Sequence, residues 1–183
     1  MDGTKAAETG LGDALGADAV PLGIVEAIWL TGERAGEMRC VDAIEAIAGI
    51  GLTGDRYGDA RSHTFARRRC QVTLIEAEHL VKTAGRFDRP LAPGIHRRNL
   101  VTRGIRLLDL ADRVFRIGEA VLVWDRRRPP CRRLDELARG PLGRALGGWG
   151  GVCTRVQTGG LIRTGDAIEI LGAAADTDPD ADT

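Results

Sequence analysis

One cysteine of this chain, Cys131, has neighbours that favour a reactive thiol. Two prolines, Pro129 and Pro130, directly precede it, so the backbone that leads to the thiol is stiff and extended. A short helix is expected to begin at Cys131, and the segment 126–133 also carries five arginines. Both features favour the thiolate, which is the form that binds metals and attacks sulfur. The alternative is a packing cysteine in a charged surface loop, but inert buried cysteines usually have apolar neighbours.

The other three cysteines, Cys40, Cys70 and Cys153, are predicted to be structural. Their spacings form no C-x-x-C pair and match no zinc pattern. Each is expected to behave as a small buried or half-buried hydrophobe. The first residues hold no apolar run that would make a secretory signal, and no stretch approaches the roughly 20 apolar residues that span a membrane. A cytoplasmic protein with reduced thiols is therefore the simplest expectation.

Arg97, Arg98 and Asn99 form a second group of candidate residues, and they follow a Pro-Gly turn signal. The planar fork of an arginine can bind a phosphate through two hydrogen bonds. The amide of Asn99 can bond the edge of a heterocycle. The alternative is a solvated loop with ordinary ion pairs.

Asp55, Arg56 and Tyr57 end a third candidate segment, which begins at Gly51 and contains Gly54. The two glycines allow the backbone to come close to a ligand or to another strand. Asp55 and Arg56 could then orient groups in a pocket. The alternative is a glycine-rich turn between two strands.

The elements that must position these residues are predicted to be mainly β. Strands are expected at 22–30, 41–47, 71–75, 99–102, 152–157 and 167–171, with a strand, turn and strand over 114–124, and short helices at 76–84, 133–138 and 141–146. Residues 158–166 are expected to form turns of a structural hairpin. Many short strands with glycines at their corners indicate a closed or partly closed β-barrel.

The chain is long enough for one domain flanked by tails. Residues 20–172 are predicted to form that domain, and residues 1–19 and 173–183 are expected to be flexible, because neither tail can bury enough apolar surface to offset chain entropy. The 26 basic and 26 acidic residues cancel, so the whole molecule is not drawn to nucleic acid or to a membrane surface. Only Lys5 and Lys82 are lysines, and this arginine excess is typical of GC-rich coding sequences.

Six segments of the chain, in this order, resemble the MOSC family, which is named after the C-terminal domain of molybdenum cofactor sulfurases. They are Gly-Leu-x-Gly-Asp-Arg-Tyr (51–57), Gln-Val-Thr-Leu-Ile (71–75), Arg-Arg-Asn-Leu-Val-Thr-x-Gly-Ile (97–105), Phe-x-Ile-Gly (115–118), Pro-Pro-Cys-x-x-Leu (129–134) and Gly-Gly-x-Ile-x-x-Gly-Asp-x-Ile (159–168). No single motif is specific, but six in order are. The resemblance implies a small stand-alone MOSC protein, with a β-barrel and a few short helices.

The resemblance also implies the molybdenum cofactor, a molybdopterin, with Cys131 as a molybdenum ligand or as the carrier of a persulfide. It places Arg97, Arg98 and Asn99 where such domains meet the cofactor. The phosphate of a pyranopterin suits arginine forks, and molybdenum takes soft thiolate ligands readily. We therefore expect residues 54–57, 97–99 and 126–133 to converge at one mouth of the barrel.

Three functions stay open at this point. The first is an oxidoreductase that acts on N-oxygenated compounds and needs a separate electron-donor protein, because the chain shows no haem, flavin or iron–sulfur motif. The second is a sulfur carrier that accepts persulfide sulfur at Cys131 from a separate cysteine desulfurase. Pyridoxal phosphate is not expected, since the chain lacks the aminotransferase-like domain of the sulfurases. The third, an RNA-binding barrel, is disfavoured by the scarcity of aromatic residues, which are 4% of the chain.

Overall fold

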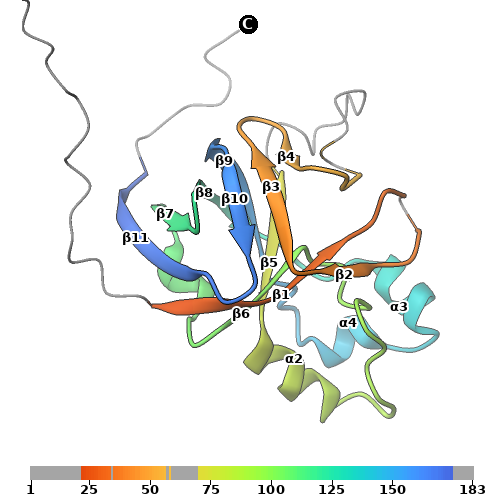
Figure 1. Ribbon diagram of the computed structural model, residues 1–183. Helices are drawn as coiled ribbons and strands as arrows, with labels where there is room; N and C mark the ends of the chain where they lie inside the picture. Colours follow the sequence, from red (N-terminus) through yellow and green to blue (C-terminus); the bar gives the residue numbers. More distant parts are fainter. Residues whose placement is uncertain (1–21, 34, 57, 59–69, 175–183) are drawn as a thin grey trace, which may run out of the picture.

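Seven strands close into a barrel in the computed structural model, which describes residues 22–33, 35–56, 58 and 70–174 (Figure 1). Around the ring they run β11 (Ala167–Ala173), β7 (Arg113–Ile117), β8 (Ala120–Arg127), β9 (Val152–Thr158), β5 (Val72–Glu76), β6 (Leu100–Arg103) and β1 (Gly23–Leu30). The pairing of β1 with β11 closes the ring, and the short strand β2 (Arg39–Val41) pairs with β1 outside it. The predicted mainly β, barrel-type fold is confirmed.

The core explains why these segments form strands. Side chains alternate between two faces, so Leu74 of β5 and Leu100 of β6 point into the barrel, where they pack with Phe115 of β7. Their neighbours Ile75 and Val101 point outward into a second apolar cluster under the helices. Since β5 is buried on both faces, its sequence, VTLIE, lacks the regular apolar and polar alternation of a half-exposed strand.

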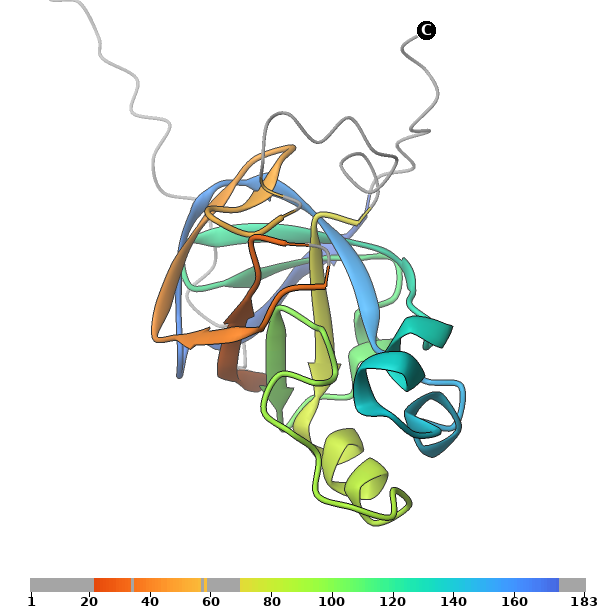
Figure 2. The same cartoon turned by 90° about the vertical axis from the view of Figure 1, so that its right-hand side faces the viewer.

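In the part of the chain that the structure describes, three short α-helices gather on one side of the barrel (Figures 1 and 2). They are α2 (Ala77–Ala84), α3 (Arg132–Ala138) and α4 (Leu142–Ala145), and a 3₁₀ turn, η1, covers Leu107–Leu110. The α2 segment connects β5 to β6, which pair in parallel and therefore need such a crossover. Leu134 of α3 and Leu142 of α4 anchor their helices in the outer cluster. All three predicted helices are present.

The segment 158–166 differs from its prediction. It contains a strand, β10 (Gly160–Arg163), which pairs with β3 (Ala43–Ile47) in a separate three-stranded sheet completed by β4 (Gly51–Leu52). The single strand expected over 41–47 is likewise divided between β2 and β3. The partner of β10 lies more than 100 residues away in the sequence, so no local pattern reveals the pairing. The glycines of this segment are typical of a turn, which led to the wrong prediction.

Two of the cysteines form a disulfide, Cys70–Cys153, so the expectation of four reduced thiols is wrong. The antiparallel pairing of β5 with β9 brings these residues together across a sequence separation of 83, with their Cα atoms 4.9 Å apart. Both are buried, as expected, but Cys40 is not. Cys40 lies on the short strand β2, where its side chain is exposed.

The predicted tails fall mostly outside the described residues, which exclude 1–21 and 175–183. At the C-terminal end β11 extends to Ala173, one residue past the expected boundary, and the amide N–H of Ala174 donates a hydrogen bond to the carbonyl of Asp112 at 2.8 Å. Within the described ranges no helix has the length and apolar character that crossing a membrane requires.

Replacement of Phe115 by alanine should destabilise the barrel strongly. Phe115 is fully buried on the inner face of β7, so the substitution leaves a cavity and should cost about 3–5 kcal/mol of unfolding free energy. Urea unfolding monitored by circular dichroism measures this. Val81→Ala on the exposed face of α2 is the control and should change stability by less than about 0.5 kcal/mol. Equal effects of the two substitutions would contradict the described core.

Thiol labelling tests the disulfide. Without reductant the unfolded chain should take up maleimide at two cysteines, Cys40 and Cys131, and after reduction at all four. Cys40→Ser should lower both counts by one. Reduction should also lower the free energy of unfolding by about 2–4 kcal/mol, because the unfolded chain loses a cross-link. Labelling of four thiols without reductant would show that the pair stays reduced.

Candidate functional site

Cys131 lies in a small pocket that is rich in arginine. The pocket has a volume of about 30 Å³, and its lining residues are Arg56, Arg97, Arg98, Arg128, Cys131, Arg133, Leu134 and Leu137. They come from the segment after β4, the loop before β6, the end of β8 and helix α3. The structure thus brings Arg56, Arg97 and Arg98 to the cysteine, across large distances in the sequence. Among the described residues that line this pocket there is no carboxylate.

Helix α3 holds Cys131 in place. Cys131 is the N-cap residue of the helix, with an extended backbone, and its carbonyl accepts a hydrogen bond from the amide N–H of Leu134 at 2.9 Å. The side chain of Leu134 is 1% exposed and packs in the outer apolar cluster, which fixes the helix to the barrel. The thiol itself remains exposed. The sequence correctly placed Cys131 on a proline-stiffened loop at a helix start.

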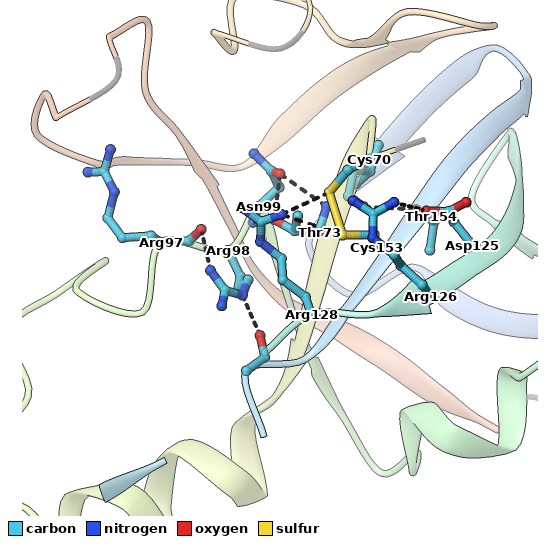
Figure 3. Close-up of a disulfide and its surroundings, with 12 residues drawn as sticks. Cys70, Thr73, Arg97, Arg98, Asn99, Asp125, Arg126, Arg128, Cys153 and Thr154 are labelled. Atoms are coloured by element: carbon cyan, nitrogen blue, oxygen red, sulfur yellow. Dashed lines mark hydrogen bonds and ion pairs between the residues drawn. A yellow bond between two sulfur atoms is a disulfide. The ribbon is translucent and has the colours of Figure 1, made fainter. Parts of the chain in front are cut away.

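Arg128, which lines the pocket, also contacts the disulfide, and Figure 3 shows this contact. Its Nη1 donates hydrogen bonds to Sγ of Cys70 at 3.2 Å and to Sγ of Cys153 at 3.6 Å. Its amide N–H also donates to the carbonyl of Gly151 at 2.8 Å. The disulfide therefore helps to set the position of a guanidinium that lines the cysteine pocket. Sequence reasoning missed this role, because only the pairing of β5 with β9 reveals it.

Arg98 is buried, with 3% of its surface exposed, and its guanidinium is held by backbone carbonyls. Its Nε donates to the carbonyl of Gly150, and its Nη1 donates to the carbonyl of Arg97 at 3.2 Å (Figure 3). A Cβ atom at Gly150 would lie 2.7 Å from Nη2 of Arg98 and 2.5 Å from the carbonyl oxygen of Arg128. A glycine is therefore required at position 150 for Arg98 and Arg128 to approach as they do.

Arg97 lies between the cysteine pocket and a second hollow. It has a positive φ of 59°, and its Nη1 donates to the carbonyl of Gly36. The second hollow has a volume of about 360 Å³ and shares Arg97 and Leu137 with the cysteine pocket. The remainder of its wall comes from the segments 35–38 and 92–95. A ligand that extends past Arg97 could therefore occupy the larger hollow as well as the cysteine pocket.

Asn99 and Asp55 lie behind the pocket and do not line it. The Oδ1 of Asn99 accepts hydrogen bonds from the amide and the hydroxyl of Thr73, at 3.1 and 2.8 Å, and its Nδ2 donates to the carbonyl of Trp29. The Oδ1 of Asp55 accepts a hydrogen bond from the amide of Thr31 at 3.2 Å. Tyr57 lies outside the described residues. A cofactor-binding role for these three residues stays a prediction.

Only two of the five arginines in segment 126–133 line the pocket. Arg126 pairs with Asp125, the guanidinium of Arg127 lies 5.5 Å from the ring centroid of Trp149, and Arg132 is 3.8 Å from Glu136 on the exposed side of α3. These three side chains therefore have partners outside the pocket. The cluster of arginines in the sequence therefore predicted more positive charge beside Cys131 than the structure places there.

His96 supports the arginines from within the fold. Its Nδ1 accepts a hydrogen bond from the amide of Arg98 at 3.1 Å, and its ring meets Trp29 edge to face at a centroid distance of 5.9 Å. Burial lowers the pKa of His96 from 6.5 to about 3, and the positive charges of Arg98 and Arg97 act in the same direction. The imidazole is therefore neutral at pH 7 and can accept this bond.

The fold and the site together define a small closed β-barrel with a thiol and several guanidinium groups in one pocket. A model of the MOSC domain matches residues 59–169, which is more than half of the chain. The chain belongs to the MOSC family. No curated protein matches the sequence significantly.

Three solved structures show the same fold. YuaD from Bacillus subtilis superimposes with a TM-score of 0.68 at 20% identity, over 81% of this chain and 94% of that one. YiiM from Escherichia coli gives 0.61 at 20% identity, over 84% and 72% of the two chains. YiiM from Geobacillus stearothermophilus gives 0.56 at 17% identity, over 84% and 75%. At these identities the likeness establishes the fold.

The depressed pKa of His96 should make stability depend on pH. Between about pH 6.5 and pH 3 the unfolded chain binds a proton at His96 that the folded chain does not, so the folded state loses stability as the pH falls through this window. The loss should reach about 4 kcal/mol. His96→Asn keeps an acceptor for the Arg98 amide but cannot titrate, so it separates this effect from that of the carboxyl groups. Urea unfolding of both proteins from pH 7 to pH 4 measures the difference, and a constant difference would contradict a neutral buried imidazole.

Proposed function

We propose that this chain binds the molybdenum cofactor at the arginine pocket and works as an oxidoreductase on N-oxygenated compounds. One observation carries the proposal: Cys131 shares a pocket with Arg56, Arg97, Arg98 and Arg128 in a chain that belongs to the MOSC family. A thiolate ligand and an anion-binding wall are the two groups that a molybdopterin needs from a protein. The proposal includes a cytoplasmic location.

The donor set fits the cofactor. Arginine forks bind phosphate oxygens through charge-assisted hydrogen bonds, and Arg98 and Arg128 are held for this by backbone carbonyls and by the disulfide. The exposed Cys131 is available as a soft ligand for molybdenum. The hollow of about 360 Å³ beside Arg97 has room for the bulkier part of the ligand.

When bound, the molybdenum centre supplies two-electron redox chemistry. In this proposal Cys131 holds the metal, the arginines neutralise the phosphate, and a separate electron-donor protein supplies the electrons. Asn99 acts through the backbone, because its hydrogen bonds to Thr73 and Trp29 fix the start of β6 directly after Arg97 and Arg98.

The exposure of Cys131 supports a second candidate function, a sulfur carrier. In this role the Cys131 thiolate attacks the terminal sulfur of a persulfide on a separate cysteine desulfurase. The bond between the two sulfur atoms of that persulfide breaks, the desulfurase regains its thiolate, and Cys131 becomes a persulfide. A buried thiol could not meet a second protein in this way.

Metal content tests the first function. Protein purified from a host that makes the cofactor should contain about one molybdenum per chain, and Cys131→Ser should lose most of it, because a hydroxyl is a poor ligand for this soft site. Cys40→Ser is the matched control, since Cys40 is also exposed but lies on β2. Elemental analysis of the three proteins gives the answer. Equal molybdenum in wild type and Cys131→Ser would rule out the ligand role.

Sulfur loading tests the second function. After incubation with a cysteine desulfurase and cysteine, mass spectrometry should find one added sulfur on Cys131 and none on Cys40. A protein that carries sulfur on Cys131 and holds no molybdenum is a carrier. A protein that shows neither property would defeat both functions.

A further inference from the structure

A second cavity lies at the other end of β6 from the arginine pocket. Its volume is about 400 Å³, which is in the range of small-molecule sites. The walls include Glu76 at the end of β5, three residues of α2, the segment 104–106 that follows β6, and Trp149. The cavity shares no residue with the arginine pocket, so the function proposed above makes no use of it.

One wall of the cavity is a fixed indole. The Nε1 of Trp149 donates a hydrogen bond to Oε2 of Glu76 at 2.7 Å, and Oε1 of Glu76 accepts from the amide of Leu107 at 3.1 Å. Glu76 is 7% exposed, and both of its oxygens are used, so it acts as a rigid brace for the ring. Ile105 adds apolar surface to the same cavity. A flat apolar ligand would find a preformed face here.

A second carboxylate of the cavity has an unmet acceptor. Oε1 of Glu78 accepts a hydrogen bond from the amide of Gly104 at 2.8 Å, but its Oε2 is buried without a partner among the described residues. Leaving a buried carboxylate oxygen without a donor costs free energy. Glu78 lines the cavity, so a donor bound there can supply the missing hydrogen bond.

The carboxyl group of Glu78 is ionised at neutral pH. Burial acts to raise its pKa, but the hydrogen bond from Gly104 and the positive charges of Arg103 and Lys82 outweigh burial, and the pKa lies below its ordinary value. Two cationic side chains, Arg106 and Lys82, also line the cavity. Arg106 is paired with Asp109 at 2.8 Å, and Lys82 lies on the exposed side of α2.

We infer that this cavity binds a small organic cation, a protonated amine or an amidinium carried on a flat apolar body. The cationic N–H groups meet the Glu78 carboxylate, and the apolar body lies against Trp149 and Ile105. A charge-assisted hydrogen bond of this kind is stronger than a neutral one, so the charge of the ligand decides its affinity. An anion would meet the carboxylates of Glu76 and Glu78, and it should bind more weakly than the cation because Arg106 is already paired with Asp109 and Lys82 is exposed.

Three probes of equal shape test the charge requirement by calorimetric titration of the full chain. Benzamidine is a cation, benzamide is neutral and benzoate is an anion. Benzamidine should bind, and the other two should bind about tenfold more weakly or worse. Tighter binding of benzoate, or no binding of benzamidine, would overturn the inference.

Two substitutions locate the binding. Glu78→Gln keeps an acceptor for the Gly104 amide and keeps the shape, so the fold should persist while affinity for benzamidine falls about tenfold. Lys82→Ala removes a nearby positive charge and should raise that affinity. Glu136→Gln, an exposed glutamate on α3, is the matched control and should leave the affinity unchanged. Unchanged affinity in Glu78→Gln, or lower affinity in Lys82→Ala, would contradict the inference, and molybdenum content is measured separately.

Discussion

The buried side chain of Asn99 joins three strands at the point where the arginine pocket begins. Its Oδ1 accepts two hydrogen bonds from Thr73 of β5, its Nδ2 donates to Trp29 of β1, and its own amide donates to Oγ1 of Thr73 at 3.0 Å. These bonds fix the register of the parallel β5–β6 pair and of its neighbour β1. Since Arg97 and Arg98 directly precede Asn99, their positions depend on this junction. The loss of Asn99 would leave several buried polar groups unpaired.

Guanidinium groups that lie around one thiol repel one another when no anion is bound. The fold holds them in place with fixed hydrogen-bond acceptors. Arg98 is held by the carbonyl of Gly150, Arg97 by the carbonyl of Gly36, and Arg128 by the sulfur atoms of the disulfide. A rigid set of donors loses little conformational entropy when an anion binds. Cys131 is held beside these arginines separately, as the N-cap residue of α3.

The segment Trp149-Gly150 lies between the arginine pocket and the cavity beside Trp149. Trp149 forms a wall of the second cavity, where it bonds Glu76, and Gly150 supports Arg98 in the arginine pocket. Arg127 also contacts the Trp149 ring, and Arg128 follows it in the sequence. Adjacent residues thus contact two hollows at opposite ends of β6, which gives the barrel a short physical connection between these hollows.

Most of the helices and barrel strands could be predicted from the sequence, although β10 and the division of 41–47 into two strands could not. Periodicity and glycine positions placed the barrel strands and the helices, and the two prolines before Cys131 placed the thiol at a helix start, because these are effects of neighbours in the chain. The tertiary structure alone decided which arginines meet the thiol, that Asn99 braces strands behind the pocket, that β10 pairs with β3, and that Cys70 bonds Cys153. Each of these depends on contacts between residues far apart in the sequence, and strand pairing sets such contacts without leaving a local signal.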